Sequence, residues 1–395
     1  MNRTPESLTL GMTTIGNPED PTVSSGWPTS LLLALREVAG HVVAVSDAPG
    51  RRLARVALAS GALLSWRPSG REDLRPSKIT LHNIGQSSGP YVAARARAAG
   101  IQLAGRTLDG LIQNGADYRN PTEYPMVTFQ DSTFIQAVRA YPWAHLQGLS
   151  QGHIKRFAQR QREAYESAVA CCAATHWVAD SIISDYGIPA SKVHVVGLGA
   201  NHQTGESKVD ERDWSRPRFL FVGVDWERKN GQAVLDAFAK VREQYPDATL
   251  DLAGGHPAIT LDGVTGHGPL AMDDPADRRQ MAEIYNRSTV FVMPSLHEPS
   301  GTVLIEAALV GIPSIGSSSG GARTCIGDSG YVVDPLEPQE ILDAMLELCN
   351  PDKAQRLGEL AREHAKLFTW RKVAERLVRA FDLPEIDLTG YAEFL

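Results

Sequence analysis

The amino-acid sequence predicts an α/β protein with two doubly wound parallel sheets, each in its own domain. The chain has 395 residues, and a domain holds on the order of 150, so two domains are expected, with or without a small addition. Hydrophobic residues make up 43% and charged residues 22%, which excludes disorder, collagen and coiled coil. Short runs rich in Val, Ile and Leu alternate with amphipathic segments, the pattern of buried parallel strands joined by helical crossovers.

The predicted strands are short apolar runs bounded by Gly, Pro or polar residues. They are residues 8–10, 41–46, 78–81, 126–129, 176–179 and 193–196, then 219–222, 249–253, 290–293, 313–315 and 331–333. Helices are predicted between them where apolar residues recur at helical spacing, at 29–38, 153–175, 231–244, 301–310, 338–348 and 351–367. The long helix 153–175 would include Cys171 and Cys172 in its small-residue end. A polar stretch near residues 198–217 marks the domain boundary, and ligands are expected beyond the carboxyl ends of the strands, in a cleft between the domains.

Charge limits the classes of partner. The net charge is −7, whereas nucleic-acid-binding domains usually carry a basic stripe, so nucleic acid is not an expected partner. Residues 1–200 carry 19 Lys and Arg against 15 Asp and Glu, and residues 201–395 carry 20 against 31. The basic excess of the first half, with the basic run 153–163, fits either an anionic acceptor or membrane surface or ordinary surface charge.

Cysteine usage and hydropathy indicate the compartment. The four cysteines have no C-x-x-C spacing, so no metal site is predicted and a reducing compartment fits. The N-terminal residues contain no apolar signal segment, and no run approaches the roughly 18 apolar residues of a spanning helix. We therefore expect a cytoplasmic protein that contacts a membrane at most peripherally.

Two glutamates eight residues apart follow the predicted strand 290–293. Glu298 precedes a turn that ends at Gly301 and Thr302, where a helix is predicted to begin, and Glu306 lies more than one turn into that helix. Backbone N–H groups at a helix N-terminus bind anions, and a carboxylate accepts two hydrogen bonds from a vicinal diol such as ribose. The same spacing also fits acidic residues that only complement the helix dipole.

A basic pair stands before another predicted helix. Arg228 and Lys229 follow a strand that ends at Gly223 and precede the helix 231–244. Cations at a helix N-terminus oppose its dipole, so this placement suggests a bound anion that offsets the repulsion, such as a diphosphate shared with the helix end at Gly301. The alternative is a solvated pair beside a glycine turn.

A third loop, residues 22–30, follows the first strand and precedes a helix. Gly26 allows close backbone approach, and Pro28 suits an early helical position. The loop lacks G-x-G-x-x-G and G-x-x-x-x-G-K-[ST], so neither a dinucleotide fingerprint nor a P-loop is predicted.

Together these motifs resemble the glycosyltransferase family 4 enzymes, whose GT-B fold has two Rossmann-like domains facing a cleft. The resemblance lies in the E-x7-E pair of Glu298 and Glu306, a G-x-P turn at 311–313, a Gly-Gly stretch at 320–321, and a G-x(4–5)-K-G-like element at 223–231. The segment 368–381 is similar to the family helix that crosses back to the first domain. The resemblance therefore implies an acceptor-side domain at 1–205, a nucleotide-sugar domain at 206–370 and a C-terminal helix at 371–395.

The resemblance also implies roles for single residues. Arg228 and Lys229 would neutralise the donor diphosphate, Glu306 would hold the ribose hydroxyls, and Glu298 a hydroxyl of the donor sugar. Gly26 would approach the diphosphate from the first domain. The remaining donor-site residues implied are Gly223, Pro299, Ser300, Gly301 and Thr302, with the base near Gly266 and His267.

This sequence departs from the family on the acceptor side. Where the family has a histidine facing the donor sugar, Gln130 or Asp131 takes its place. Asp131 either accepts a sugar or acceptor hydroxyl, as a fourth catalytic candidate beside the basic pair and Glu298, or caps the helical segment 132–140. Trp27, in a predicted loop, is the candidate for stacking on the acceptor.

The resemblance implies a retaining glycosyltransferase that moves a hexose-type sugar from a nucleotide sugar, UDP favoured and GDP next, to an alcohol in glycan, glycolipid or glycosylated metabolite synthesis. The acceptor would be a sugar, a lipid-linked molecule or a small alcohol. No metal and no cofactor are expected beyond the co-substrate. The alternatives are a GT-B phosphorylase and a non-catalytic sugar-nucleotide-binding protein on the same scaffold.

Overall fold

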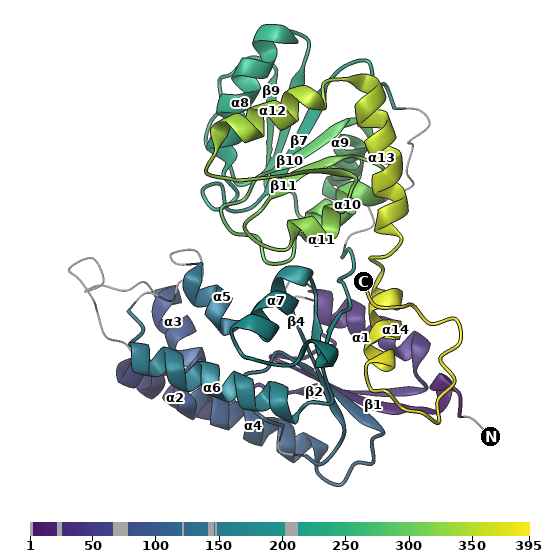
Figure 1. The fold of residues 1–395 in the computed structure, drawn as a ribbon. Helices are drawn as coiled ribbons and strands as arrows, with labels where there is room; N and C mark the ends of the chain where they lie inside the picture. The colour runs from purple at the N-terminus through teal and green to yellow at the C-terminus, as the bar shows by residue number, and fades with distance from the viewer. Residues whose placement is uncertain are drawn as a thin grey trace. The chain divides into compact units, whose positions relative to one another are not determined.

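A computed structural model describes residues 3–21, 26–65, 78–120, 122–140, 146, 148–201 and 212–395 (Figure 1). The chain divides into two compact units, Met1–Gly197 with Trp370–Leu395, and Leu198–Thr369. The divisions expected from the sequence lie at 205/206 and 370/371, and residues 202–211 of the polar boundary stretch fall outside the described residues. Each unit has its own parallel sheet covered by helices, which confirms the predicted α/β class.

Among the described residues, the first unit holds a six-stranded parallel sheet in the order β2-β1-β3-β4-β5-β6. Its strands are β1 (Thr9–Thr14), β2 (His41–Ser46), β3 (Gly110–Asn114), β4 (Met126–Gln130), β5 (Ala170–Ala173) and β6 (Val193–Val195). Its helices are α1 (Trp27–Val38), α2 (Arg51–Ser65), α3 (Lys78–Gln86), α4 (Gly89–Leu103), α5 (Phe134–Arg139), α6 (Gln151–Ser167), α7 (His176–Ser184) and α14 (Trp370–Arg379).

The second unit repeats the architecture with the order β12-β11-β10-β7-β8-β9, again parallel. Its strands are β7 (Arg218–Gly223), β8 (Thr249–Gly254), β9 (Val264–Gly268), β10 (Val290–Met293), β11 (Ser314–Ser317) and β12 (Gly330–Val333). Its helices are α8 (Gly231–Gln244), α9 (Pro275–Arg287), α10 (Thr302–Leu309), α11 (Ala322–Ile326), α12 (Pro338–Glu347) and α13 (Pro351–Ala365).

Three predicted elements of the first unit were wrong. Residues 78–81 belong to helix α3, and residues 176–179 open helix α7, where the Thr175 side chain accepts a hydrogen bond from the Val178 N–H. The long helix 153–175 ends at Ser167, and Cys171 and Cys172 lie in strand β5. Four-residue apolar runs do not distinguish a strand from a buried helix turn, and the sequence ACCA of β5 lacks the β-branched residues typical of strands.

The C-terminal helix α14 packs in the first unit. It lies against α1, where the Trp370 ring stacks on Trp27 with centroids 6.1 Å apart. The buried guanidinium of Arg376 donates to the carbonyl of Val196 at 3.0 Å. The chain end therefore contributes to the first sheet's core rather than to the unit that precedes it in sequence.

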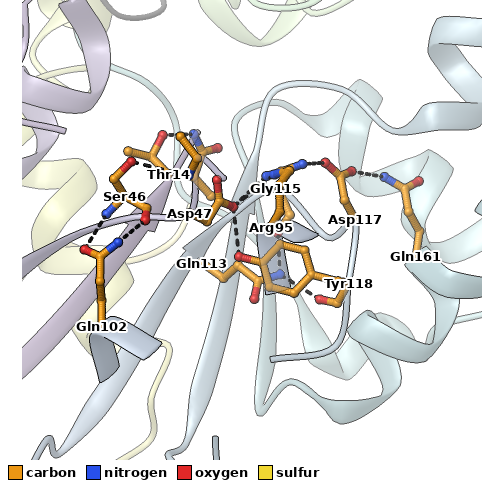
Figure 2. A network of polar contacts seen from close by, with 12 residues as sticks. Thr14, Ser46, Asp47, Arg95, Gln102, Gln113, Gly115, Asp117, Tyr118 and Gln161 are labelled. Atoms are coloured by element: carbon orange, nitrogen blue, oxygen red, sulfur yellow. Dashed lines mark hydrogen bonds and ion pairs between the residues drawn. The ribbon is translucent and has the colours of Figure 1, made fainter. Parts of the chain in front are cut away.

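A buried ionic network lies at the carboxyl ends of β2 and β3 (Figure 2). The Arg95 guanidinium, 2% exposed, donates to the Asp47 carboxylate at 2.7 Å and also to Asp117. The Tyr118 hydroxyl donates to Asp47 at 2.8 Å. Burial acts to lower the pKa of Arg95, but the charges of Asp117 and Asp47 outweigh it and raise that pKa.

We predict that Arg95→Leu destabilises the first unit by about 3–5 kcal/mol, because the substitution leaves buried Asp47 without its counter-charge. Urea unfolding followed by circular dichroism measures the change. Arg97→Leu, an exposed position on the same helix, is the control and is expected to change stability by no more than about 0.5 kcal/mol. Equal effects of the two substitutions would contradict a structural role for the Arg95 ion pairs.

Candidate functional site

The loop between β7 and α8 brings the basic pair to the carboxyl end of the second sheet. Strand β7 ends at Gly223, and a side chain there would bring its Cβ within 2.8 Å of Lys229 Cγ. Glycine therefore leaves the space through which Lys229 passes. The Lys229 side chain is buried, at 8% exposure, and Asn230 caps α8 in the left-handed conformation with φ 60°.

The loop between β10 and α10 carries Glu298 and depends on the Gly-Gly stretch. The N–H of Gly321 donates to the Glu298 carbonyl at 2.9 Å. Gly320 has φ 138°, and a Cβ there would lie 1.9 Å from the Glu298 carbonyl oxygen. A side chain at 320 would force these backbones apart, so the small-residue stretch has a direct role in placing Glu298.

Glu298 lies at the centre of a four-partner cluster. Its carboxylate accepts from the ammonium of Lys229, and it lies 3.6 Å from Nη1 of Arg228. It also accepts from the N–H of Gly301 at 3.2 Å and from the hydroxyl of Ser295 at 3.5 Å. These contacts make Glu298 the counter-ion of the basic pair.

The environment of Glu298 favours its charged form. Burial acts to raise the pKa of the carboxyl, but the charge and hydrogen bond of Lys229, with the charge of Arg228, outweigh it. The pKa of Glu298 therefore lies below its ordinary value of 4.5. The carboxylate is ionised at neutral pH and neutralises part of the positive charge beside it.

This arrangement corrects one inference from the sequence. The placement of Arg228 and Lys229 before α8 suggested an external anion that offsets repulsion by the helix dipole. In the structure Glu298 supplies the offsetting charge. The N–H of Gly301, expected to bind an anion, donates to the same carboxylate. The cations are therefore paired internally, and the dipole argument alone does not require a ligand.

Glu306 lies in α10, the helix that follows the Glu298 loop, and it contacts α9. Its side chain is buried, at 5% exposure, and Oε2 accepts from the Tyr285 hydroxyl at 3.4 Å. Tyr285 lies in α9 and gave no sequence signal, because an aromatic residue in a helix is usually part of the core. Ser300 lies between Glu298 and Glu306 in the sequence, and its carbonyl accepts from the Cys325 thiol at 3.0 Å. Pro299 lies in the loop before α10, and Thr302 is the first residue of that helix.

The predicted base-binding residues, Gly266 and His267, lie near the carboxyl end of strand β9. His267 Nε2 is 2.7 Å from Asp251 Oδ1, and Gln280 Nε2 is 3.1 Å from His267 Nδ1. Arg287 also donates to Asp251, at 2.6 Å. His267 is thus held by a network linking β8, β9 and α9, and Gly266 beside it packs against the ring of His256.

In the first unit, the structure changes the setting of three predicted residues. Gly26 is the residue before α1 and has φ 80°, which favours glycine. Trp27 is the first residue of helix α1 rather than a loop residue, and it packs edge-on against Phe129 with centroids 5.6 Å apart. Residues 22–25 of that loop fall outside the described residues.

The acceptor-side pair follows β4. The Gln130 side chain is buried and donates to the Tyr165 hydroxyl, whereas Asp131 is exposed. Asp131 is not a helix cap: Thr133 caps α5, with a reciprocal capping box to Gln136. The structure thus removes one of the two interpretations of Asp131 and leaves its role in a site as a prediction.

A family model described as Glycosyl transferases group 1 matches residues 216–351. A D-inositol 3-phosphate glycosyltransferase of Corynebacterium urealyticum is 30% identical over 44% of this chain and 45% of the relative. A mannosylfructose-phosphate synthase of Agrobacterium fabrum is 26% identical over 61% of this chain and 60% of the relative. The chain spans about half the length of the first curated relatives that it matches.

Solved structures share the fold over nearly the whole chain. A glycosyltransferase from Rickettsia africae has a TM-score of 0.61 at 13% identity and covers 98% of this chain and 100% of that one. A sucrose-phosphate synthase from Thermosynechococcus elongatus has a TM-score of 0.58 at 17% identity, covering 95% and 98%. The fold is therefore that of the GT-B glycosyltransferases. The family-model match in the second unit, the curated relatives and the fold all agree with the resemblance to the glycosyltransferase family 4 enzymes.

We predict that Glu298→Gln binds inorganic pyrophosphate at least about tenfold more tightly than the wild type, because a charge removed within several ångströms of the anion is worth more than 1.4 kcal/mol at an effective dielectric constant of 20. Isothermal titration calorimetry measures the affinity. Glu227→Gln, an exposed neighbour of the basic pair, is the matched control and should change affinity little. Weaker or unchanged binding by Glu298→Gln would show that Glu298 does not compete with an anion.

A pH series tests the ion pair through stability. A carboxyl whose pKa is depressed by folding stabilises the native state above its unfolded pKa, and this contribution disappears as the pH falls through the folded pKa. Below about pH 4.5, the ordinary value for Glu298, the free energy of unfolding of the wild type should therefore fall more steeply than that of Glu298→Gln. Parallel curves in urea unfolding at several pH values would contradict the pairing with Lys229.

Proposed function

We propose that this protein is a retaining glycosyltransferase that transfers a hexose-type sugar from a nucleotide sugar, UDP favoured and GDP next, to an alcohol acceptor. The observation that carries the proposal is the cluster of Lys229, Arg228 and Glu298 beside the N-terminus of α10. It lies within the segment that the glycosyl transferases group 1 model matches. Cations and a helix N-terminus can bind the phosphates of a nucleotide sugar, and a carboxylate can accept hydrogen bonds from its hydroxyl groups.

The chemistry assigns a role to each charged group. Breaking the bond between the anomeric carbon and phosphate leaves negative charge on the departing diphosphate, which preorganised cations stabilise. We assign that role to Lys229 and Arg228. Glu306 would accept hydrogen bonds from the ribose hydroxyls, with Tyr285 fixing its orientation. Glu298 would accept from a hydroxyl of the donor sugar. The departing phosphate can take the acceptor proton, so no protein base is proposed.

The remaining donor-site assignments are part of the same proposal. Gly223, Gly301 and Thr302 would present backbone to the phosphates, with Pro299 and Ser300 beside the sugar. Gly26 would serve the diphosphate from the first unit, and Trp27, Gln130 and Asp131 the acceptor. His267 and Gly266 would lie near the base. No cofactor or metal is proposed, and the nucleotide sugar is the co-substrate.

The names of the curated relatives favour a small acceptor. They include an inositol 3-phosphate glycosyltransferase and a mannosylfructose-phosphate synthase. We therefore propose a phosphorylated polyol or sugar as the acceptor class to test first, ahead of polysaccharide or lipid-linked alcohols. A cytoplasmic location fits such substrates. No described helix is both long and apolar enough to cross a bilayer.

The first test is a thermal-shift titration with UDP, GDP, ADP and their sugars. A ligand that binds only the folded protein stabilises it by about 2.7 kcal/mol at 100 times its dissociation constant. We expect a response selective for one nucleotide that is lost in Glu306→Gln, which keeps the side-chain size. Glu283→Gln, an exposed position on α9, is the control. A response to phosphate or sugar phosphate in place of nucleotides would favour a phosphorylase.

Turnover with the nucleotide sugar so identified then tests transfer. Lys229→Ala should lower kcat by about 10²–10³, the usual cost of removing one contact to a developing anion. Proton NMR of the product reports whether the anomeric configuration is retained. Nucleotide-sugar binding without transfer or hydrolysis would support the non-catalytic alternative, and inversion would overturn the retaining mechanism.

A further inference from the structure

Helix α2 exposes most of its large apolar residues, and the residues it buries are all small. The buried positions are Ala57, Gly61, Ala62 and Ser65. The exposed positions include Leu53 at 50%, Val56 at 66%, Leu63 at 76% and Leu64 at 66% exposure. A surface helix of a globular protein normally has the opposite arrangement, with its large apolar side chains against the core.

The buried side of α2 is fully used by neighbouring helices. Helix α2 packs against α3 and α4. A Cβ at Gly61 would lie 1.9 Å from Ser88 Oγ, and a Cβ at Gly85 would lie 2.7 Å from the Leu58 carbonyl oxygen. Such close packing requires small residues on the inner face. Packing within the protein therefore does not account for the large apolar residues on the exposed side of α2.

The exposed apolar residues of α2 form one stripe along the helix. Successive members of positions 53, 56, 63 and 64 differ by three, seven and one in residue number. At 3.6 residues per turn, all four therefore fall on one side of the helix. We call Leu53, Val56, Leu63 and Leu64 the α2 outer face. Contiguous exposed apolar surface marks an interaction site, whereas single exposed apolar residues are ordinary.

Charge identifies the kind of partner. Helix α2 carries the exposed cations Arg51, Arg52 and Arg55, and neither α2 nor α3 contains an Asp or Glu. The neighbouring α3 begins with exposed Lys78 and Ile79. A second copy docked on this face through a two-fold axis would bring these like charges together. A surface of fixed negative charge over an apolar layer complements both features.

We propose that the α2 outer face binds anionic lipid membranes peripherally. Leu53, Val56, Leu63 and Leu64 would enter the boundary between headgroups and acyl chains, and the arginines would pair with lipid phosphates, as in interfacial amphipathic helices. The basic run 153–163, in α6, fitted either a membrane contact or ordinary surface charge. There Arg162 pairs with Glu166 of the same helix at 2.8 Å, whereas α2 contains no acidic residue. This inference does not depend on the proposed transfer reaction.

Vesicle flotation of the full-length protein tests the proposal. The probe is phosphatidylcholine vesicles with and without phosphatidylglycerol, at low and physiological salt. We expect binding to the anionic vesicles that weakens with salt, since each Lys or Arg near an anionic surface contributes about fivefold in affinity. Arg52→Glu with Arg55→Glu should therefore weaken binding by about 25-fold or more.

Leu63→Glu with Leu64→Glu tests the apolar contribution and should abolish flotation. Leu336→Glu is the matched control, since Leu336 is 74% exposed in the second unit, and it should bind as the wild type does. Circular dichroism confirms that each variant folds. The proposal is overturned by absence of binding, by equal binding to neutral vesicles, by equal loss in Leu336→Glu, or by light scattering that shows a dimer dispersed by the leucine substitutions without vesicle binding.

Discussion

The ion pair between Lys229 and Glu298 connects two loops that are 69 residues apart in sequence. Both loops leave the sheet at its carboxyl end, after β7 and β10, which are neighbours in the parallel sheet. Burying these charges has a large desolvation cost, so each group requires its partner. The pair therefore determines where both loops go. The surrounding glycines follow from it: Gly223 leaves room for the lysine stem, and Gly320 lets the next loop approach the Glu298 backbone.

This pairing shows how much of the site the sequence could predict. The residues that meet there were selected on local grounds, as a glutamate before a helix and a basic pair before another. These residues contact each other because β7 lies beside β10 in the sheet. Local sequence patterns give no information about strand order. The dipole argument therefore assigned the missing charge to a ligand, although a carboxylate in the same chain supplies it. Tyr285, which orients Glu306, had no signal because burial of an aromatic helix residue is ordinary.

The fold was more predictable in the second unit than in the first for a physical reason. Its strands contain runs such as FLFV and VFVM, whose apolar and β-branched residues distinguish buried strands. In the first unit, the tight packing of α2 on α3 uses Gly and Ala, and β5 uses Ala and Cys. Small residues carry little periodic signal. The same feature leaves most of the large apolar residues of α2 exposed, and no helix was predicted at residues 51–65.

The internal counter-ion also affects how binding energy is used, if the proposed transfer takes place at this site. A nucleotide sugar that enters must share Lys229 and Arg228 with Glu298, which weakens ground-state binding. As the sugar–phosphate bond breaks, the diphosphate gains charge and competes better for both cations. The interaction is then stronger in the transition state than in the ground state, which is the condition for accelerating the chemical step. A site with unpaired cations would bind substrate and diphosphate product tightly from the start, and slow product release would limit turnover.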